Sequence, residues 1–176
     1  MKILMLVAHP DDEVVFGASD LLSNTNTNEI TVVCFTCGNN RIRRKEFEEC
    51  MRLTNAKGYM LSLHDSIRDN WYQYSNSVLG DMAYRLLAEQ SFCFDMIVSH
   101  GEDGEYGHIQ HKRVHNVAKE LSQRLSCPFA TFRERYNPEN MKNRDEIMKV
   151  YKSQARIISR FKDLFIESSA ASNSRR

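Results

Sequence analysis

The 176-residue sequence has little proline, little glycine and almost no net charge. Its 3 prolines and 7 glycines are too few for a collagen-like or Pro/Gly-rich disordered chain. Its 24 Lys and Arg balance 23 Asp and Glu, so the formal net charge of +1 gives no electrostatic reason to expect a nucleic-acid partner. Hydrophobic residues make up 41% of the chain, which predicts one globular domain with a sizeable core.

Long apolar runs are also lacking. None reaches the roughly 18 residues that a membrane span needs, so we expect no such span. The apolar run at 3–8 is followed at once by His-Pro-Asp-Asp-Glu and not by a small-residue cleavage site, so it predicts an N-terminal strand rather than a signal peptide. The five cysteines are an odd number and lie mostly in apolar stretches, which favours reduced thiols and a cytoplasmic protein.

Strand and helix patterns alternate along the chain. Apolar runs predict strands at 3–8, 30–35 and 92–98, with weaker candidates at 59–63 and 129–132. Apolar residues at helical spacing predict helices around 47–54, 78–87 and 114–125, and one long C-terminal helix over 147–165. We therefore predict a single Rossmann-like α/β domain over residues 1–167, with a doubly wound, mostly parallel sheet of about five strands and helices on both faces. The apolar-poor tail 168–176 is expected to be disordered.

Acidic residues and a histidine follow the first predicted strand. Residues 8–13 read AHPDDE, and ligands of doubly wound folds bind outside the carboxyl ends of the strands. Asp11 or Asp12 could simply cap a helix that begins near Glu13. One acid suffices for a cap, so the whole cluster favours a metal site.

A second cluster follows the fourth predicted strand. A loop with GxxGxxG spacing, unlike a dinucleotide or Walker motif, leads into His108 and His111, which share one helix face. Histidines at a helix start can also merely meet backbone or solvent. Two imidazoles and a carboxylate at neighbouring strand ends suit zinc with three protein ligands and an open position. The residues alone do not tell which of the two adjacent aspartates is the ligand.

These segments resemble those of a known family. Residues 8–13 match the AHPDDE signature of the LmbE-like/PIG-L zinc-dependent N-deacetylases, and 104–111 resemble their G-x-Y-G-H-x-x-H motif. Residues 151–154 are similar to their aromatic/His-x-Ser-Gln segment, so the resemblance spans about 1–154. It implies a Rossmann-like fold and zinc-dependent hydrolysis of an N-acetyl group, usually on an amino sugar, which releases acetate and a free amine.

Carried over by position, the resemblance also implies a role for each site residue. His9, Asp12 and His111 would bind one Zn²⁺ per chain. Asp11 would be the general base, and His108 would stabilise the oxyanion. The substrate would be a small molecule or glycoconjugate with an N-acetyl amino sugar, and the sequence leaves a homo-oligomer open.

The chain departs from the family at Gln110, where many members have Asp. An Asp there could keep His108 protonated, whereas Gln cannot do so by charge, and Glu105 or Asp103 are candidates to replace it. The chain is also shorter than many members. Both departures motivate an alternative function, a non-catalytic metal-binding accessory protein of a glycan pathway.

Four residues are candidate substrate contacts. Arg44 belongs to an Arg-rich helix start at the predicted catalytic edge, where it would hold an anionic group or simply face solvent. Asp65 follows the third strand, and Tyr106 lies in the second motif. Trp71 lies in a loop, 69–74, that mixes polar and aromatic residues as sugar-stacking surfaces do, although the aromatics could equally anchor the loop by packing.

Overall fold

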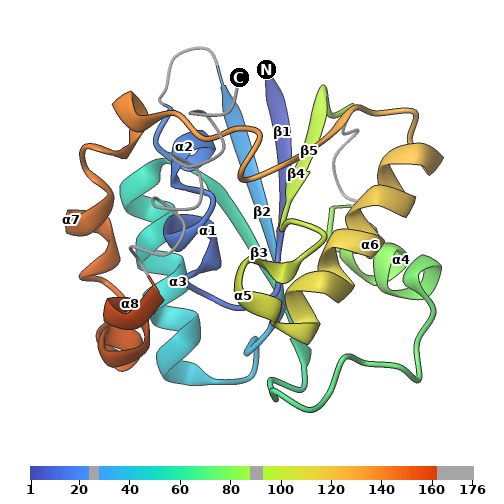
Figure 1. Cartoon of the computed structure of the whole chain (residues 1–176), viewed down its shortest axis with the longest axis horizontal. Coiled ribbons are helices and arrows are strands. Elements are labelled where there is room, and N and C mark those ends of the chain that lie inside the picture. Colours follow the sequence, from blue (N-terminus) through green and yellow to red (C-terminus); the bar gives the residue numbers. More distant parts are fainter. Residues whose placement is uncertain (24–27, 88–92, 162–176) are drawn as a thin grey trace.

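The computed structural model describes residues 1–23, 28–87 and 93–161 (Figure 1). Its centre is a five-stranded sheet in the order β3-β2-β1-β4-β5, in which every pair of neighbours is parallel. The strands are β1 Lys2–Val7, β2 Glu29–Thr36, β3 Lys57–Leu63, β4 Met96–Ser99 and β5 Phe129–Thr131. Each predicted strand corresponds to one observed strand, although β4 begins at Met96, later than the predicted 92–98, and residue 92 lies outside the described residues. The sheet reverses its winding direction between β1 and β4. Ligands of such folds bind at this switch point.

Helices cover both faces of the sheet. The elements α1, α2, α3, α7 and α8 lie on one side, and α4 and α6 lie on the other (Figure 1). The helical elements are α1 Asp12–Val15, α2 Ala18–Leu21, α3 Arg41–Thr54, α4 Asn76–Arg85, α5 Gly104–Gly107, α6 Ile109–Arg124, η1 Pro138–Met141, α7 Arg144–Met148, η2 Lys152–Gln154 and α8 Ala155–Phe161. The predicted Rossmann-like α/β fold is confirmed.

The core explains the continuous apolar run of β1. Ile3, Met5 and Val7 point into the cluster beneath α1, α3 and α7, whereas Leu4 and Leu6 point into the cluster beneath α4 and α6. Successive side chains of a strand alternate between its two faces. Because both faces are covered, both sets must be apolar, and β1 lies at the centre of the molecule.

The predicted C-terminal helix over 147–165 is wrong as one continuous element. The helix α7 ends at Met148, and the chain turns before η2 and α8 begin. The turn allows the fully buried Tyr151 to donate its hydroxyl hydrogen bond to Glu13, while Glu46 accepts from the backbone N–H of Ser153 at 2.8 Å. Tertiary hydrogen bonds thus override the helical periodicity. Phe165 and the predicted tail 168–176 lie outside the described residues.

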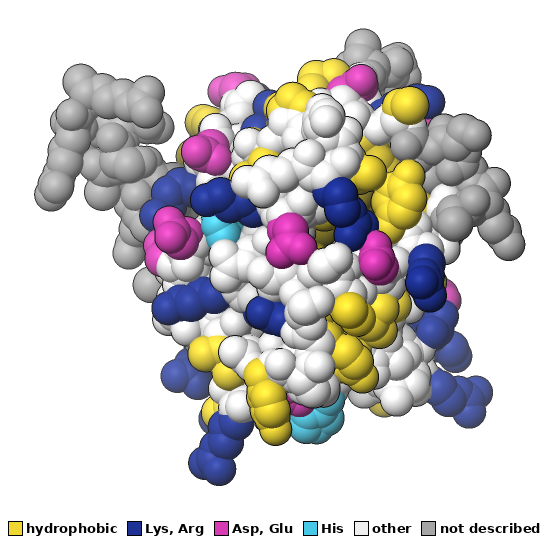
Figure 2. Space-filling model, turned by 90° about the vertical axis from the view of Figure 1, so that its right-hand side faces the viewer, with side chains coloured by type: hydrophobic (Ala, Val, Ile, Leu, Met, Phe, Trp, Pro, Cys, Tyr) yellow, Lys and Arg dark blue, Asp and Glu magenta, His cyan; other side chains and the backbone are white. Residues whose placement is uncertain are grey.

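The surface agrees with the balanced composition. On the side where α4 and α6 lie, Lys and Arg side chains are interspersed with Asp and Glu (Figure 2). Among the described residues, no helix combines the length and the apolar character needed to cross a membrane. All five cysteines are free thiols, as the odd number suggested.

Candidate active site

The carboxyl ends of β1 and β4 bring three side chains to one point. His9 follows β1, Asp12 opens α1, and His111 lies in the first turn of α6. His9 Nδ1 lies 3.2 Å from Asp12 Oδ2 and 3.3 Å from His111 Nε2, and His111 Nε2 lies 3.4 Å from Asp12 Oδ1. The two sequence clusters therefore form one site.

These distances fit the edge of a zinc coordination sphere. Zinc–nitrogen and zinc–oxygen distances of about 2.0–2.1 Å in a tetrahedron place neighbouring ligand atoms about 3.3 Å apart. The distance between the two ring nitrogens of His9 and His111 matches this spacing, and each of these nitrogens lies 3.2–3.4 Å from a different oxygen of Asp12. Two overlapping groups, His9 with His108 and His111, and Asp12 with His100 and His111, keep one ligand atom from each residue within 4.8 Å of one another.

Gln110 orients the ring of His9. Its Oε1 lies 2.7 Å from His9 Nε2, and its Nε2 donates to the carbonyl of His64 at 2.9 Å. With its amide fixed in this way, the oxygen of Gln110 accepts the Nε2–H of His9, and Nδ1 is the ring nitrogen that faces Asp12 and His111. The residue that departs from the family pattern therefore has a clear place in this site.

Asp11 and Asp12 have different environments although they are adjacent. Asp11 occupies the N-cap position of α1 with φ 117°, but its side chain makes no capping hydrogen bond. Its carboxylate lies 3.3 Å from the guanidinium of Arg43, and its backbone N–H donates to Glu13. A positive φ at a non-glycine residue costs about 1–3 kcal/mol. The capping alternative therefore does not account for Asp11.

The pKa values of the two aspartates are pushed apart. Burial raises the pKa of Asp11 well above its ordinary value, and the nearby Asp12 raises it further against the opposing charge of Arg43. Burial would also raise the pKa of Asp12, but the imidazoles of His111 and His9 hold it well below its ordinary value. Such a pair separates a permanently ionised carboxylate from one able to exchange a proton.

The ring of His108 is neutral and can donate one hydrogen bond. It precedes α6 as its N-cap, and its Nδ1 accepts from the backbone N–H of Gln110 at 3.3 Å. Burial, together with His111 and His9, lowers the pKa of His108 to about 4. The remaining proton therefore lies on Nε2. Glu105 does not take the place of the missing Asp beside His108, because its carboxylate contacts His111 and His100.

Asp103, the other candidate replacement, is likewise engaged elsewhere. Its carboxylate pairs with Arg133 at 3.1 Å and caps the backbone N–H of Glu105. An acid beside His108 is not needed for a donor of this kind, because the neutral tautomer already presents an N–H.

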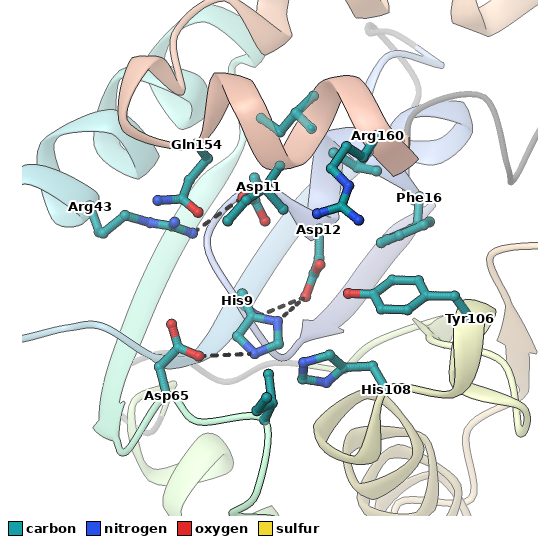
Figure 3. Close-up of a pocket in the computed structure, with 14 residues that line it drawn as sticks. His9, Asp11, Asp12, Phe16, Arg43, Asp65, Tyr106, His108, Gln154 and Arg160 are labelled. Atoms are coloured by element: carbon teal, nitrogen blue, oxygen red, sulfur yellow. Dashed lines mark hydrogen bonds and ion pairs between the residues drawn. The ribbon is translucent and has the colours of Figure 1, made fainter.

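A pocket of about 340 Å³ opens over these residues. Figure 3 shows His9, Asp12 and His108 at its base, with Asp65 and Arg43 on one side and Tyr106 on the other. Gln154 and Arg160, from η2 and α8, overhang it. Apolar lining comes from Val15, Phe16, Ile67, Ile157 and Ile158. The volume is in the range of small-molecule sites, and two of the candidate substrate contacts, Asp65 and Tyr106, lie in it.

The other two candidate substrate contacts lie elsewhere. Trp71 is fully buried, stacks on Phe35 with ring centroids 5.9 Å apart, and donates from its indole to the carbonyl of His64. Arg44 bonds the carbonyl of Gly38 and does not line the pocket. Arg43 does line it, because one residue along a helix turns the side chain by about 100°.

The buried position of Trp71 predicts a large difference between two adjacent aromatics. We expect Trp71→Ala to lower the free energy of unfolding by about 3–5 kcal/mol, since it removes a large core side chain. Tyr72, which is 84% exposed, is the matched control, and Tyr72→Ala should change stability by no more than about 0.5 kcal/mol. Urea unfolding of both variants measures this, and equal effects would contradict the packing role of Trp71.

Sequence reasoning left His100 without a role. It follows β4 as His9 follows β1, so its position at a strand end was the available signal. The ring of His100 stacks on that of His111, with centroids 4.0 Å apart and an interplanar angle of 20°. Its Nε2 accepts from the backbone N–H of Ala8 at 3.2 Å. His100 therefore packs against the cluster, and the ring of His115 bonds the carbonyl of His100.

The fold and the site together define a Rossmann-like α/β protein with a candidate His/Asp metal centre at the carboxyl edge of its sheet. Residues 4–122 match the model of the GlcNAc-PI de-N-acetylase family, PIG-L, and the chain belongs to this family of deacetylases.

The chain is also similar to individual proteins. An uncharacterised protein of Acanthamoeba polyphaga mimivirus, L374, is 29% identical over 89% of this chain and 73% of its own length. The 1D-myo-inositol 2-acetamido-2-deoxy-alpha-D-glucopyranoside deacetylase of Corynebacterium diphtheriae is 24% identical over 72% of this chain, which spans 54% of that enzyme. The N,N'-diacetylchitobiose deacetylase of Pyrococcus horikoshii shares the fold with a TM-score of 0.64 at 24% identity, over 93% of this chain and 75% of that one.

Proposed function

We propose that this protein is a zinc-dependent N-deacetylase that removes the acetyl group from an amino-sugar substrate. The observation that carries the proposal is the cluster of His9, Asp12 and His111, whose ring nitrogens and carboxylate oxygens lie 3.2–3.4 Å apart, together with the adjacent carboxylate of Asp11. The amino sugar is supported by two relatives, whose names specify a 2-acetamido-2-deoxy-glucopyranoside and a diacetylchitobiose. The five free thiols support a reducing compartment such as the cytoplasm.

His9, Asp12 and His111 would hold the zinc. When bound by His9, Asp12 and His111, zinc supplies a Lewis acid and lowers the pKa of a coordinated water towards ~7. Asp12 is suited to the ligand role because its carboxylate stays ionised. Asp11 is suited to the base role because its raised pKa lets it hold a proton during turnover.

The protein residues then divide the work of hydrolysis. Asp11 accepts a proton from the water that attacks the amide carbonyl carbon. The Nε2–H of His108 donates to the carbonyl oxygen as that atom becomes negative. The carbon–nitrogen bond breaks, and Asp11 returns its proton to the leaving nitrogen. The products are acetate and the free amine.

The pocket has groups suited to a sugar. Asp65, Arg43 and Gln154 offer acceptors and donors for hydroxyl groups, and Phe16 offers an apolar surface. We propose these contacts because the residues line the pocket, and not because they belong to the family motifs. They favour one pyranose ring close to the reactive carboxylates.

Acetate release from N-acetylated sugars tests the proposal. With added zinc, the wild-type protein should release acetate from at least one member of a panel of free, phosphorylated and glycosidic N-acetylglucosamines, detected by mass spectrometry as a deacetylated product. His108→Ala should reduce turnover about 10²–10³-fold, the usual cost of one oxyanion donor, while binding the same amount of zinc. His64→Ala, whose side chain is largely exposed, is the control and should be active.

The alternative function predicts a different pattern. A protein that binds zinc through His111 but deacetylates no sugar in the panel would favour the non-catalytic accessory role. Loss of zinc in His108→Ala would instead favour the ligand group that contains His108.

A further inference from the structure

A buried glutamate joins two histidines of the site. Glu105 lies in α5, and its side chain is 5% exposed. Its Oε2 lies 2.7 Å from His111 Nδ1 and 2.9 Å from His100 Nδ1, and its Oε1 accepts from the backbone N–H of Gly101 at 2.9 Å. One oxygen of the carboxylate therefore contacts both rings, while the other accepts a hydrogen bond from the loop that follows β4.

The backbone of Glu105 is strained where it makes these contacts. Its φ of 60° and ψ of −61° lie close to the γ-turn conformation that is rare and unfavourable for ordinary residues. Such strain costs about 1–3 kcal/mol and persists where the surroundings demand it. The carboxylate of Asp103 accepts from the N–H of Glu105 at 3.2 Å and helps to hold the turn. This backbone conformation brings the Glu105 carboxylate into contact with the rings of His111 and His100.

The contacts assign one proton on each ring. An ionised carboxylate only accepts hydrogen bonds, so each ring nitrogen that lies within hydrogen-bond distance of Glu105 Oε2 must be the donor. Nδ1 of both His111 and His100 therefore carries the proton. The Nε2 lone pair of His111 is left to face His9 and Asp12, while that of His100 accepts from the N–H of Ala8.

We infer that Glu105 is a positioning residue that fixes the tautomer and orientation of His111 and thereby sets the affinity of the site for zinc. The inference rests on the ligand set of the proposed function. A carboxylate that accepts the far N–H of a ligand histidine also makes its other nitrogen more basic, and loss of such a partner typically costs about 10–100-fold in metal affinity. Gln110 acts on His9 in the corresponding way, but with a neutral amide.

Glu105→Gln tests the inference, with Glu102→Gln as the matched control. Glu102 lies in the same loop with an exposed side chain, so the control makes the same chemical change three residues away. In competition with a chromophoric chelator, Glu105→Gln should bind zinc about 10–100-fold more weakly than wild type, and Glu102→Gln should bind it as wild type does. Glu105→Asp keeps the charge, but its shorter side chain moves the carboxylate oxygens away from the histidine rings. This variant should also bind zinc more weakly.

Nitrogen NMR of the histidine rings in the metal-free protein gives a second measurement that does not depend on activity. Wild-type His111 should carry its proton on Nδ1, and Glu105→Gln should show a mixture of the two tautomers. Zinc affinity of Glu105→Gln equal to that of wild type would overturn the inference. A wild-type His111 with its proton on Nε2 would also overturn it, and this measurement does not require the variants to fold. Wild-type protein that binds no zinc would overturn the proposed metal site as well, so the two failures are distinguishable.

Discussion

Asp11→Asn is expected to keep both the fold and the bound zinc, yet to lose about 10²–10⁴-fold in turnover, the usual contribution of a general base. The amide cannot accept a proton from the attacking water. Asn is among the residues that best tolerate a positive φ, so the backbone at 117° should persist. The hydrogen bond from the Asp11 N–H to Glu13 and the bond from Arg43 to the carbonyl of Pro10 do not involve the substituted side chain.

Acetate release and elemental analysis of the same preparation measure this result. Asp81→Asn is the matched control, because Asp81 lies on α4 and pairs with Arg124 away from the pocket. The control should retain wild-type turnover and zinc. Turnover of Asp11→Asn close to wild type would remove Asp11 from the mechanism. Loss of zinc in this variant would show that Asp11 is a ligand instead.

Asp12→Ala and His111→Ala should lose zinc and activity together. Each change removes one of three ligands, and the remaining two leave an incomplete coordination sphere. Both side chains are buried and their ligand atoms face one another. Elemental analysis after dialysis should find little zinc in either variant, with circular dichroism to establish that the fold is intact.

The comparison between Asp11→Asn and Asp12→Ala distinguishes the ligand role from the base role. Zinc retained in Asp12→Ala and lost in Asp11→Asn would reverse their roles. Full retention of zinc in His111→Ala would contradict every ligand group considered for this site, because all of them include His111.

Several features of this protein could be predicted from its sequence because they depend on local pattern. The run 3–8 is apolar at every position and the run 30–35 at every position but Thr31. Such runs favour strands covered on both faces, and the intervening helical stripes then favour a doubly wound sheet. Parallel strands end at one edge, so His9 and the His108–His111 pair were expected to meet there. The structure brings His9 and His111 within hydrogen-bond distance of each other. The ligand and base roles of individual residues stay predictions.

The tertiary structure alone decided which side chains face the pocket. Periodicity tells which face of an element is apolar, but not which other element covers it. Trp71 therefore packs on Phe35 rather than on substrate, and Arg43 rather than Arg44 reaches Asp11. The predicted C-terminal helix is interrupted because Tyr151 donates a hydrogen bond to Glu13, which lies 138 residues away in the sequence.

The contacts within the site were also beyond the sequence. Glu105 meets His111 only because its backbone adopts a strained turn, and Asp11 reaches Arg43 from a positive φ. Such conformations are held by many contacts at once and leave no periodic signature in the chain. The sequence determined which residue types gather at the edge of the sheet. Strand register and loop conformation decided which atoms face one another, because hydrogen bonds and metal coordination depend on geometry finer than one residue spacing.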